Sequence, residues 1–424
     1  MTYFFYLLNV LVVGGLCYLI WQRELASPLK KYLLPALVLK ITSGILLGVF
    51  YQVYFGGGDI QVFQDQANLV TEYARVSPAS YVRLLLTRKF ESETLRSALT
   101  FYWYSNSYFT IMLLSFLNFL TGGHIFLNGL YFSLFSFWGL YQLVKVLGRL
   151  NSMFFLPAVI AFLFFPSVVF WSSGISKEAV YLGSLGWLIA AMLRLVYSLS
   201  GRVWLNVLFV LVAGYLLWKI KFYFAILVFA LLLAYSAVIF LERRFNIFKS
   251  KRNKIILFCL TALIGGVIVS GWQEAIRIDY FIEQLINSNV VLAERSAGKP
   301  FVSFPDLQPN LRSIISHSPA AVFHVITRPF IWEGHSFFYL LAGLENLFIL
   351  LLLFAALFRL FRNGTGWLNL GVVVILIYVV VIAALIGLST PNIGSLFRYR
   401  VAVLPFLVFL LLVVQYKWFG RKLI

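Results

Sequence analysis

Long apolar runs are the feature that most restricts how this chain can fold. Three examples are residues 3–21, 203–218 and 338–358. Each approaches or reaches the roughly 20 residues that a helix needs to cross the hydrocarbon layer of a membrane. Because 62% of the 424 residues are hydrophobic and 12% are charged, the chain has more apolar surface than a soluble core of this length can hide. The sequence therefore predicts an all-α, polytopic transmembrane helix bundle.

The apolar runs predict about eleven membrane-spanning helices, with boundaries good to about 2 to 4 residues. We expect the first of them to be retained, because no basic residue precedes it and no small-residue cleavage site follows it. The stretch 108–120, about 13 residues long, is too short to cross and predicts an interfacial or re-entrant helix. The predicted spans are 3–22, 32–54, 124–147, 152–171, 177–197, 203–220, 223–242, 254–272, 337–360, 367–388 and 401–417.

Basic residues mark one side of this bundle. The short connections on that side are rich in Lys and Arg, and such connections face the cytoplasm in membrane proteins. This places the N-terminus outside and the C-terminus inside a bacterial inner (cytoplasmic) membrane. Of the 15 acidic residues, only Glu24 and Glu242 fall in the inner connections. The formal net charge of +19 thus reflects topology, and no nucleic-acid partner is expected because the sequence has no soluble basic domain.

Two long segments, 56–123 and 273–336, lie on the outer side of the predicted bundle. In the first, apolar residues recur among polar ones at helical spacing, which predicts amphipathic helices along the membrane surface. The apolar residues of one such helix are Ile60, Phe63, Ala67, Leu69 and Val70. We expect both segments to form a periplasmic cap and the whole chain, 1–424, to be a single transmembrane domain.

A glycine triplet followed by an aspartate, Gly56-Gly57-Gly58-Asp59, stands directly after the second predicted span. Glycines let the backbone turn sharply at a helix end and approach a ligand closely. A carboxylate at the membrane surface is suited to act as a general base toward an acceptor hydroxyl. Asp65, six residues on, points to another side of a helix and is a secondary, acceptor-side candidate. The alternative is a solvated loop in which Asp59 is a helix N-cap. A divalent metal at these two carboxylates is a further open alternative, and no other cofactor or metal site is predicted.

The residues around Asp59 resemble those of the C-type (GT-C) polyprenyl-phosphate-sugar glycosyltransferases, a superfamily that includes dolichyl-phosphate-mannose protein mannosyltransferases. Many of those proteins have an Asp-Glu pair after an early helix, an aromatic residue four positions later and a small residue eight positions later. Asp59, Phe63 and Ala67 match this pattern, whereas Ile60 stands in place of the Glu. The resemblance implies a membrane bundle with an outer active site and assigns catalysis to Asp59 alone.

Two further segments carry the same resemblance. Residues 166–178 look like the family's helix, outer turn and acidic helix start, which ends here in Glu178. Residues 398–406 look like the start of a late helix that contains Arg and Pro in the family. These motifs together cover about a tenth of the chain, and the order of elements is similar over most of it. We expect Glu178 to lie near the sugar or the acceptor.

Five basic residues fall at predicted outer helix ends, against the positive-inside trend. A polyprenyl phosphate or pyrophosphate brings a negative group to this depth, and Lys or Arg neutralises such a group through charge-assisted hydrogen bonds. We expect these residues to form the site for the donor phosphate. The alternative is that their side chains extend toward lipid head groups. The five residues are Lys177, Lys219, Lys221, Arg398 and Arg400.

A last cluster, residues 328–335, precedes the span at 337–360 and joins an Arg, an aromatic ring, a carboxylate and an imidazole. Such a set suits a sugar, with Trp332 stacking on its apolar face and Glu333 accepting from its hydroxyls. An interfacial aromatic anchor with a salt bridge is an equal alternative. Its four candidate residues are Arg328, Trp332, Glu333 and His335. Glu345 and Lys40 lie inside spans, where charged residues are costly and are candidates for function.

Taken together, these patterns predict a glycosyltransferase that moves a sugar from a polyprenyl-phosphate-linked donor to an envelope glycan, lipid or protein acceptor at the outer membrane face. A Wzy-like polysaccharide polymerase or an O-antigen ligase, also acting on lipid-linked sugars, is the first alternative. The second is a transporter or flippase for lipid-linked sugars, which would depend on broken helices and on polar residues near the middle of the membrane.

Overall fold

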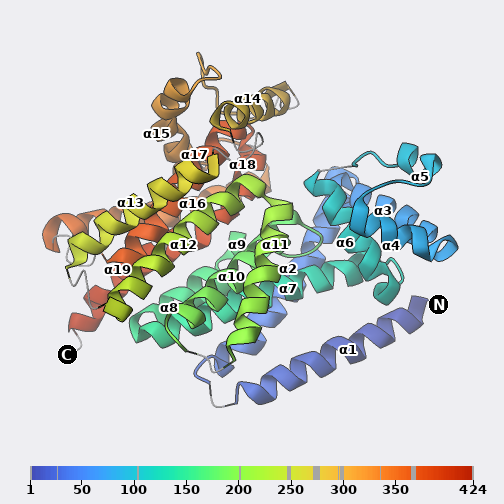
Figure 1. Ribbon diagram of the computed structural model, residues 1–424, viewed down its shortest axis with the longest axis horizontal. Coiled ribbons are helices and arrows are strands. Elements are labelled where there is room, and N and C mark those ends of the chain that lie inside the picture. Colours follow the sequence, from blue (N-terminus) through green and yellow to red (C-terminus); the bar gives the residue numbers. More distant parts are fainter. Residues whose placement is uncertain are drawn as a thin grey trace. The chain divides into compact units, whose positions relative to one another are not determined.

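Helices account for all the regular secondary structure in the described part of the chain (Figure 1). The computed structural model describes residues 2–25, 27–102, 105–199, 202–245, 250–270, 277–294, 296, 300–334, 336–363 and 369–422. The elements in chain order are α1 (Thr2–Arg23), α2 (Lys30–Phe55), α3 (Gly58–Val76), α4 (Pro78–Thr87), α5 (Glu93–Ala98), α6 (Asn106–Thr121), α7 (Ile125–Leu150), α8 (Ser152–Val159), the π-helix η1 (Ile160–Phe164), α9 (Pro166–Trp171), α10 (Lys177–Val196), α11 (Val203–Ile220), α12 (Phe222–Phe245), α13 (Lys251–Ser270), α14 (Ile278–Glu294), α15 (Leu311–Thr327), α16 (Phe337–Asn363), α17 (Leu370–Ser389), α18 (Ile393–Tyr399), the 3-10 helix η3 (Arg400–Ala402) and α19 (Leu404–Lys422). The predicted all-α class is confirmed.

Eight of the described helices are long and apolar enough to cross a membrane, namely α1, α2, α7, α10, α11, α12, α16 and α17. The number rises to nine if Ile393–Ala402 and Leu404–Tyr416, which meet at an angle of 64°, form one bent span. Each of the eight coincides with a predicted span. These helices support a membrane protein with several candidate spans, whereas the predicted count of about eleven exceeds the number found among the described residues.

The predicted span at 152–171 is divided into shorter pieces. It comprises α8, the π-helix η1 and α9, and Pro166 begins α9. Proline lacks a backbone N–H and cannot continue the preceding helical ladder, so the axis is interrupted at this point. The predicted span at 254–272 corresponds to α13 and extends beyond the described residues, which resume at position 277.

The described helices group into two compact units, which are treated separately. Unit 1 consists of Met1–Lys145, Val169–Ala190 and Val207–Phe222. Unit 2 consists of Val146–Val168, Ala191–Asn206 and Tyr223–Ile424.

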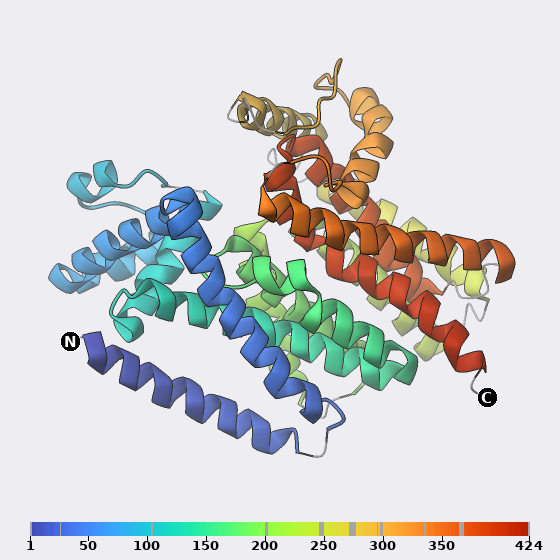
Figure 2. The same cartoon turned by 180° about the vertical axis from the view of Figure 1, so that it is seen from behind.

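In unit 1, α1 and α2 are joined by a short turn at one end (Figure 2). Glu24 in this turn is buried and accepts a hydrogen bond from Lys145 of α7. At the other end of α1, the Asn9 side chain donates to the carbonyl of Leu120 at 3.0 Å. The helices α7 and α10 approach very closely, because a Cβ atom at Gly139 would lie 2.1 Å from the carbonyl oxygen of Gly183.

The helices α3 and α6 form the main part of segment 56–123 and pack side by side (Figure 1). Ile60, Phe63, Ala67 and Val70 are buried as the amphipathic pattern predicts, whereas Leu69 is 40% exposed and lies on the opposite face. With 16 residues, α6 is below the length needed for a span. That α6 lies along the membrane surface or enters it from one side stays a prediction.

Polar side chains join α3, α6 and α7 in the interior of unit 1. The Asn128 amide donates to Gln64 at 2.9 Å and to Asn118 at 2.7 Å. The Asn118 amide donates in turn to Asn68 and to Thr71, both at 3.0 Å. Buried amides cost free energy unless they are hydrogen-bonded. This amide network therefore fixes α3 on α6 in one register.

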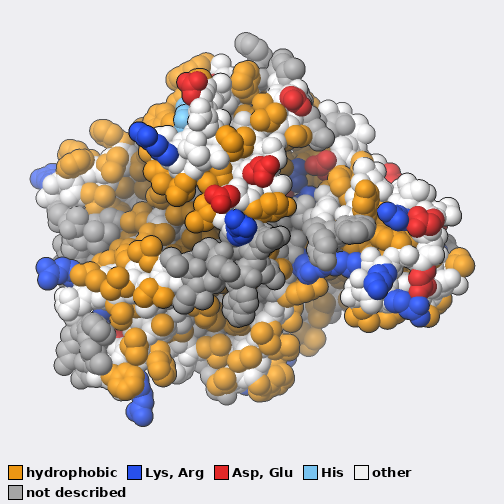
Figure 3. All heavy atoms as spheres, turned by 45° about the horizontal axis from the view of Figure 1, so that its top comes forward, with side chains coloured by type: hydrophobic (Ala, Val, Ile, Leu, Met, Phe, Trp, Pro, Cys, Tyr) orange, Lys and Arg blue, Asp and Glu red, His pale blue; other side chains and the backbone are white. Residues whose placement is uncertain are grey.

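In unit 2, segment 273–336 provides α14 and α15, which pack on α17 through a small apolar core. Two backbone hydrogen bonds hold the loop before α15 against the residues that follow α17. The N–H of Val302 donates to the carbonyl of Pro391 at 2.8 Å, and the N–H of Ile393 donates to the carbonyl of Pro300 at 3.1 Å. The helix α14 contains Asp279, Glu283 and Glu294, whereas α15 contains Arg312 and no acidic residue, and the face in Figure 3 shows both acidic and basic side chains. The side chains of the apolar core are Ile282, Leu285, Ile314, Ala321 and Leu388.

Candidate functional site

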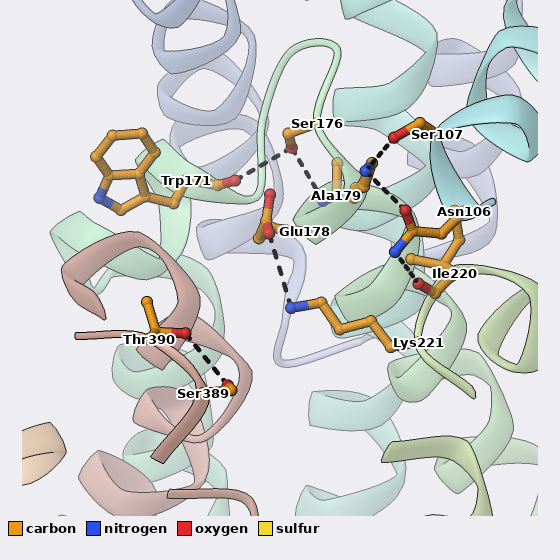
Figure 4. A network of polar contacts seen from close by, with 11 residues as sticks. Asn106, Ser107, Trp171, Ser176, Glu178, Ala179, Ile220, Lys221, Ser389 and Thr390 are labelled. Atoms are coloured by element: carbon orange, nitrogen blue, oxygen red, sulfur yellow. Dashed lines mark hydrogen bonds and ion pairs between the residues drawn. The ribbon is translucent and has the colours of Figure 1, made fainter. Parts of the chain in front are cut away.

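A buried, serine-rich turn, residues 172–176, sets the position of the start of α10 in unit 1. Gly174 has a φ of +60°, a conformation that glycine adopts without strain. Its N–H donates to the Ser133 hydroxyl of α7 at 2.8 Å. The Ser176 hydroxyl accepts from the backbone N–H of Ala179 at 3.0 Å, which caps the first turn of α10 (Figure 4). The side chains that follow, Lys177 and Glu178, are therefore held in defined positions.

Lys40 of α2 stabilises this turn. Its side chain is 3% exposed, and its ammonium group donates to both the carbonyl and the hydroxyl of Ser172 at 2.5 Å. It also lies 3.5 Å from the carbonyl of Val169. A cation is favourable here because carbonyls at the end of a helix carry partial negative charge. Lys40 thus points into the unit rather than extending toward head groups, and it supports the turn instead of facing a ligand.

Lys177 lies where the starts of α3, α6 and α10 come together. Its ammonium group donates to Asn106 at 2.8 Å and to the Ser107 hydroxyl at 2.7 Å. It also lies over the ring of Phe63, 5.2 Å from the centroid, in the geometry of a cation–π contact. The Asn106 amide donates to the carbonyl of Ile220 at 3.2 Å (Figure 4). The end of α11 therefore joins the same group of helix ends.

Glu178 and Lys221 form the second half of this helix-end cluster. The Glu178 carboxylate is buried, with 2% of its side chain exposed, and lies 3.8 Å from the Lys221 ammonium (Figure 4). Lys221 also stands over the ring of Tyr181 at 5.7 Å, and Lys219 stands over Tyr215 at 5.3 Å. The structure thus brings together three residues that the sequence singled out, Lys177, Glu178 and Lys221, with Lys219 two residues away along the chain.

Asp59 lies in the first turn of α3, and its side chain is exposed. Because Phe63 is four residues further along the helix, Asp59 and Phe63 are on one face of α3. The carboxylate is therefore one turn away from the ring that Lys177 covers. Asp65 is exposed as well, but its carboxylate accepts from Gln61 of the same helix at 2.8 Å. The two aspartates are not on one face.

In unit 2, Arg400 is 1% exposed and is the centre of a buried polar cluster. It donates to Asn346 and to the carbonyl of Arg328, each at 2.7 Å. Its second Nη atom is 3.7 Å from the carboxylate of Glu345. Glu345 accepts a hydrogen bond from the backbone N–H of Ser167 at 2.9 Å. Arg400 therefore ties α9, α16 and the end of α15 together, while Arg398 is partly exposed.

The sugar-binding cluster predicted at 328–335 forms a compact loop. Arg328 and Glu333 are joined by an ion pair of 2.9 Å. The other oxygen of Glu333 accepts from the backbone N–H of Phe330 at 2.8 Å. Trp332 is 77% exposed and stacks on Phe330, with ring centroids 5.1 Å apart. Both oxygens of Glu333 thus have partners within the loop, and Trp332 is its most exposed predicted residue. His335 lies outside the described residues.

His324 is a titratable group on α15. Burial lowers the pKa of His324, and the nearby charge of Arg328 lowers it further. Among the described residues, no three His, Cys, Asp or Glu side chains come together as a metal site would require. The described carboxylates at Asp59 and Asp65 are one pair on separate faces of α3.

The interior polar groups were the main feature that the sequence did not reveal. Within the amide network, Gln64 is hydrogen-bonded to Asn118 and to Asn128, each more than fifty positions away in the sequence. Asn and Gln inside predicted apolar or amphipathic helices are the only signal for it.

The comparisons with known proteins add no relative. No family model matches the chain, and neither a curated protein nor a solved structure matches it. The resemblance to the C-type glycosyltransferases therefore rests on the motifs of this sequence.

Proposed function

We propose that this protein is a membrane glycosyltransferase that uses a polyprenyl-phosphate-linked sugar donor at the outer face of a bacterial inner membrane. The observation that supports this function most is the helix-end cluster of unit 1. There, Lys177 and Lys221 stand beside the buried Glu178, and Asp59 lies one helical turn from the ring under Lys177. Sugar transfer with a phosphate as the leaving group requires a base for the acceptor hydroxyl and cations that stabilise the departing phosphate.

In the proposed reaction, the Asp59 carboxylate takes the proton of an acceptor hydroxyl. The acceptor oxygen forms a bond to the anomeric carbon of the sugar as the bond from that carbon to the phosphate oxygen breaks. The polyprenyl phosphate leaves with the electron pair of the broken bond, and the lysines neutralise its charge. Glu178 keeps the cluster from being uniformly positive and holds Lys221 in place.

The test uses the full chain in lipid nanodiscs with a panel of radiolabelled undecaprenyl-phosphate sugars. We expect release of undecaprenyl phosphate together with transfer of the label. Asp59→Asn should lower the transfer rate by at least about 100-fold, with undecaprenyl phosphate binding retained. Asp65→Asn is the matched control, because it removes the same charge from the same helix while Asp65 binds Gln61.

A second pair of measurements tests the phosphate site. Lys177→Met and Lys221→Met should each weaken binding of undecaprenyl phosphate but not of undecaprenol. Full transfer by Asp59→Asn would remove the assigned base. Equal binding of the phosphate and the alcohol by the unaltered protein would exclude the phosphate site.

A transporter for lipid-linked sugars is the second candidate, and one observation favours it. Helices are broken at η1 and at the 64° bend before α19, as is typical of transporters. Movement of a fluorescent lipid-linked sugar across proteoliposomes, without release of polyprenyl phosphate, would favour this candidate over the transferase.

A further inference from the structure

The aromatic loop of unit 2, residues 328–334, is held in one conformation by its own polar groups. One oxygen of Glu333 pairs with Arg328 at 2.9 Å, and the other accepts from the backbone N–H of Phe330 at 2.8 Å. The N–H of Glu333 donates back to the carbonyl of Phe330 at 3.1 Å, which closes the turn between them. Arg400 donates to the carbonyl of Arg328 at 2.7 Å. The loop is therefore fixed both at its start and at its turn.

The aromatic loop folds back along the side of α16. A Cβ atom at Gly343 would lie 2.7 Å from the Cα atom of Ile331 and 2.9 Å from its backbone nitrogen, so the loop backbone lies directly against the helix. A Cβ atom at Gly334 would lie 2.3 Å from the ring of Tyr339. Because α16 begins at Phe337, Gly343 is about 9 Å along its axis. The loop thus reaches about 9 Å past the end of α16 toward the middle of the helix.

This depth lies within the apolar part of α16, a helix long and apolar enough to cross a membrane. Leu340 and Leu347, three residues before Gly343 and four residues after it, are on the same side of the helix and are exposed. Exposed apolar side chains on a helix that spans a membrane face lipid. The aromatic loop therefore borders a lipid-facing stripe of α16, just inside the level at which head groups meet acyl chains.

Trp332, next to Ile331 in the loop, is 77% exposed and stacks on Phe330, with ring centroids 5.1 Å apart and an angle of 8° between the rings. Trp side chains concentrate at the boundary between head groups and acyl chains, because the ring is apolar and its N–H needs a hydrogen-bond acceptor. A glycan in water does not reach a ring at this depth. We propose that Phe330 and Trp332 anchor unit 2 in the lipid bilayer, with the Trp332 ring among the lipid carbonyls. The anchor does not depend on the proposed transferase activity.

The test measures depth in the bilayer by electron paramagnetic resonance of the full chain in phosphatidylcholine nanodiscs. Cys17 and Cys259 are replaced by alanine, and Trp332→Cys carries a single nitroxide label. Its collision rates with oxygen, which concentrates in lipid, and with a water-soluble nickel chelate give the depth. The exposed residues Phe337 and Leu347, labelled in the same way, calibrate it over about 15 Å of α16. We expect the label at position 332 to lie about 9 Å deeper than that at 337 and to be shallower than that at 347.

Glu283→Cys is the control for water, since Glu283 is exposed on α14; its label should collide mainly with the nickel chelate. A second measurement keeps the native cysteines and uses lipids brominated near the carbonyl, which quench Trp fluorescence on contact. Trp332→Phe should lose part of the quenching, whereas Trp171→Phe, which removes a buried ring, should not lower it. More frequent nickel collisions at 332 than at 337, or undiminished quenching in Trp332→Phe, would overturn the anchor and favour a glycan as the partner of the two rings.

Discussion

Lys40 in unit 1 and Arg400 in unit 2 are both buried cations, 3% and 1% exposed, but their surroundings differ. Lys40 contacts the oxygens of neutral groups, namely two carbonyls and a hydroxyl. Arg400 lies next to the carboxylate of Glu345 and also binds a carbonyl and an amide. Loss of Lys40 removes hydrogen bonds, whereas loss of Arg400 leaves an opposite charge without its partner. One buried cation completes a turn, and the other neutralises an acid.

The largest expected effect follows from removing Arg400. Arg400→Met should lower the free energy of unfolding by about 3–5 kcal/mol, because a buried carboxylate then loses its counter-ion. Chemical denaturation in detergent, followed by circular dichroism, measures this change. Arg398→Met is the control, since Arg398 is partly exposed and two residues away.

The double variant R400M/E345Q sharpens the same comparison. Replacing Glu345 by glutamine should recover part of the lost free energy of unfolding, because no unpaired charge is then buried. The amide oxygen can still accept a hydrogen bond from Ser167. A double variant as unstable as the sum of the two single variants would show that the charges of Arg400 and Glu345 do not interact.

Replacing Lys40 should have a smaller effect. Lys40→Met should cost about 1–3 kcal/mol, the range for leaving a buried acceptor without its hydrogen bond. Ser172→Ala, which removes one of the accepting oxygens, should cost less than Lys40→Met in the same denaturation experiment. A loss for Lys40→Met as large as that for Arg400→Met would contradict the distinction between the two cations.

The smallest effect is expected from His324, which becomes charged only when it binds a proton, unlike the buried cations Lys40 and Arg400. Because the pKa of His324 is lowered in the folded protein, the unfolded chain binds its proton at a higher pH. Stability from this group is present above the unfolded pKa of about 6.5 and is lost as pH falls toward the folded pKa. His324→Gln should therefore show a smaller decrease in melting temperature than the unaltered protein between pH 7.5 and pH 5.5.

His317→Gln, on the same helix, is the matched control for this small effect. If both variants changed the pH dependence equally, the assignment to His324 would be wrong. The expected change is a fraction of what Arg400→Met produces, because His324 is partly exposed and water screens its charge.

Much of the fold follows from local composition. The eight helices that are long enough to span coincide with apolar runs, because a segment in hydrocarbon has to satisfy its backbone internally as a helix. The break at η1 and α9 was not predicted, since residues 160–165 are as apolar as the span around them. Whether Pro166 interrupts a span or starts its next helix depends on tertiary contacts of the chain.

For the candidate site, the sequence predicted individual residues but not which of them contact each other. Lys177, Glu178 and Lys221 were recognised as charged residues at helix ends, but Asn106 and Ser107, the partners of Lys177, lie about seventy positions earlier in the sequence. Glu333 shows the opposite case, because its residue type suggested a sugar ligand while its oxygens hold the loop together. Contacts across such separations depend on packing, which periodicity and motif spacing do not encode.

The amide network between α3, α6 and α7 has a consequence for the environment in which this protein works. Amide groups have no charge to gain or lose near neutral pH, and a buried contact between neutral groups is little affected by dissolved salt. Changes in pH and in ionic strength act on charged side chains such as lysine, glutamate and aspartate. The helix that carries Asp59 is thus held in place by neutral hydrogen-bonding groups. Its position therefore does not depend on pH near neutrality or on the ionic strength of the solution.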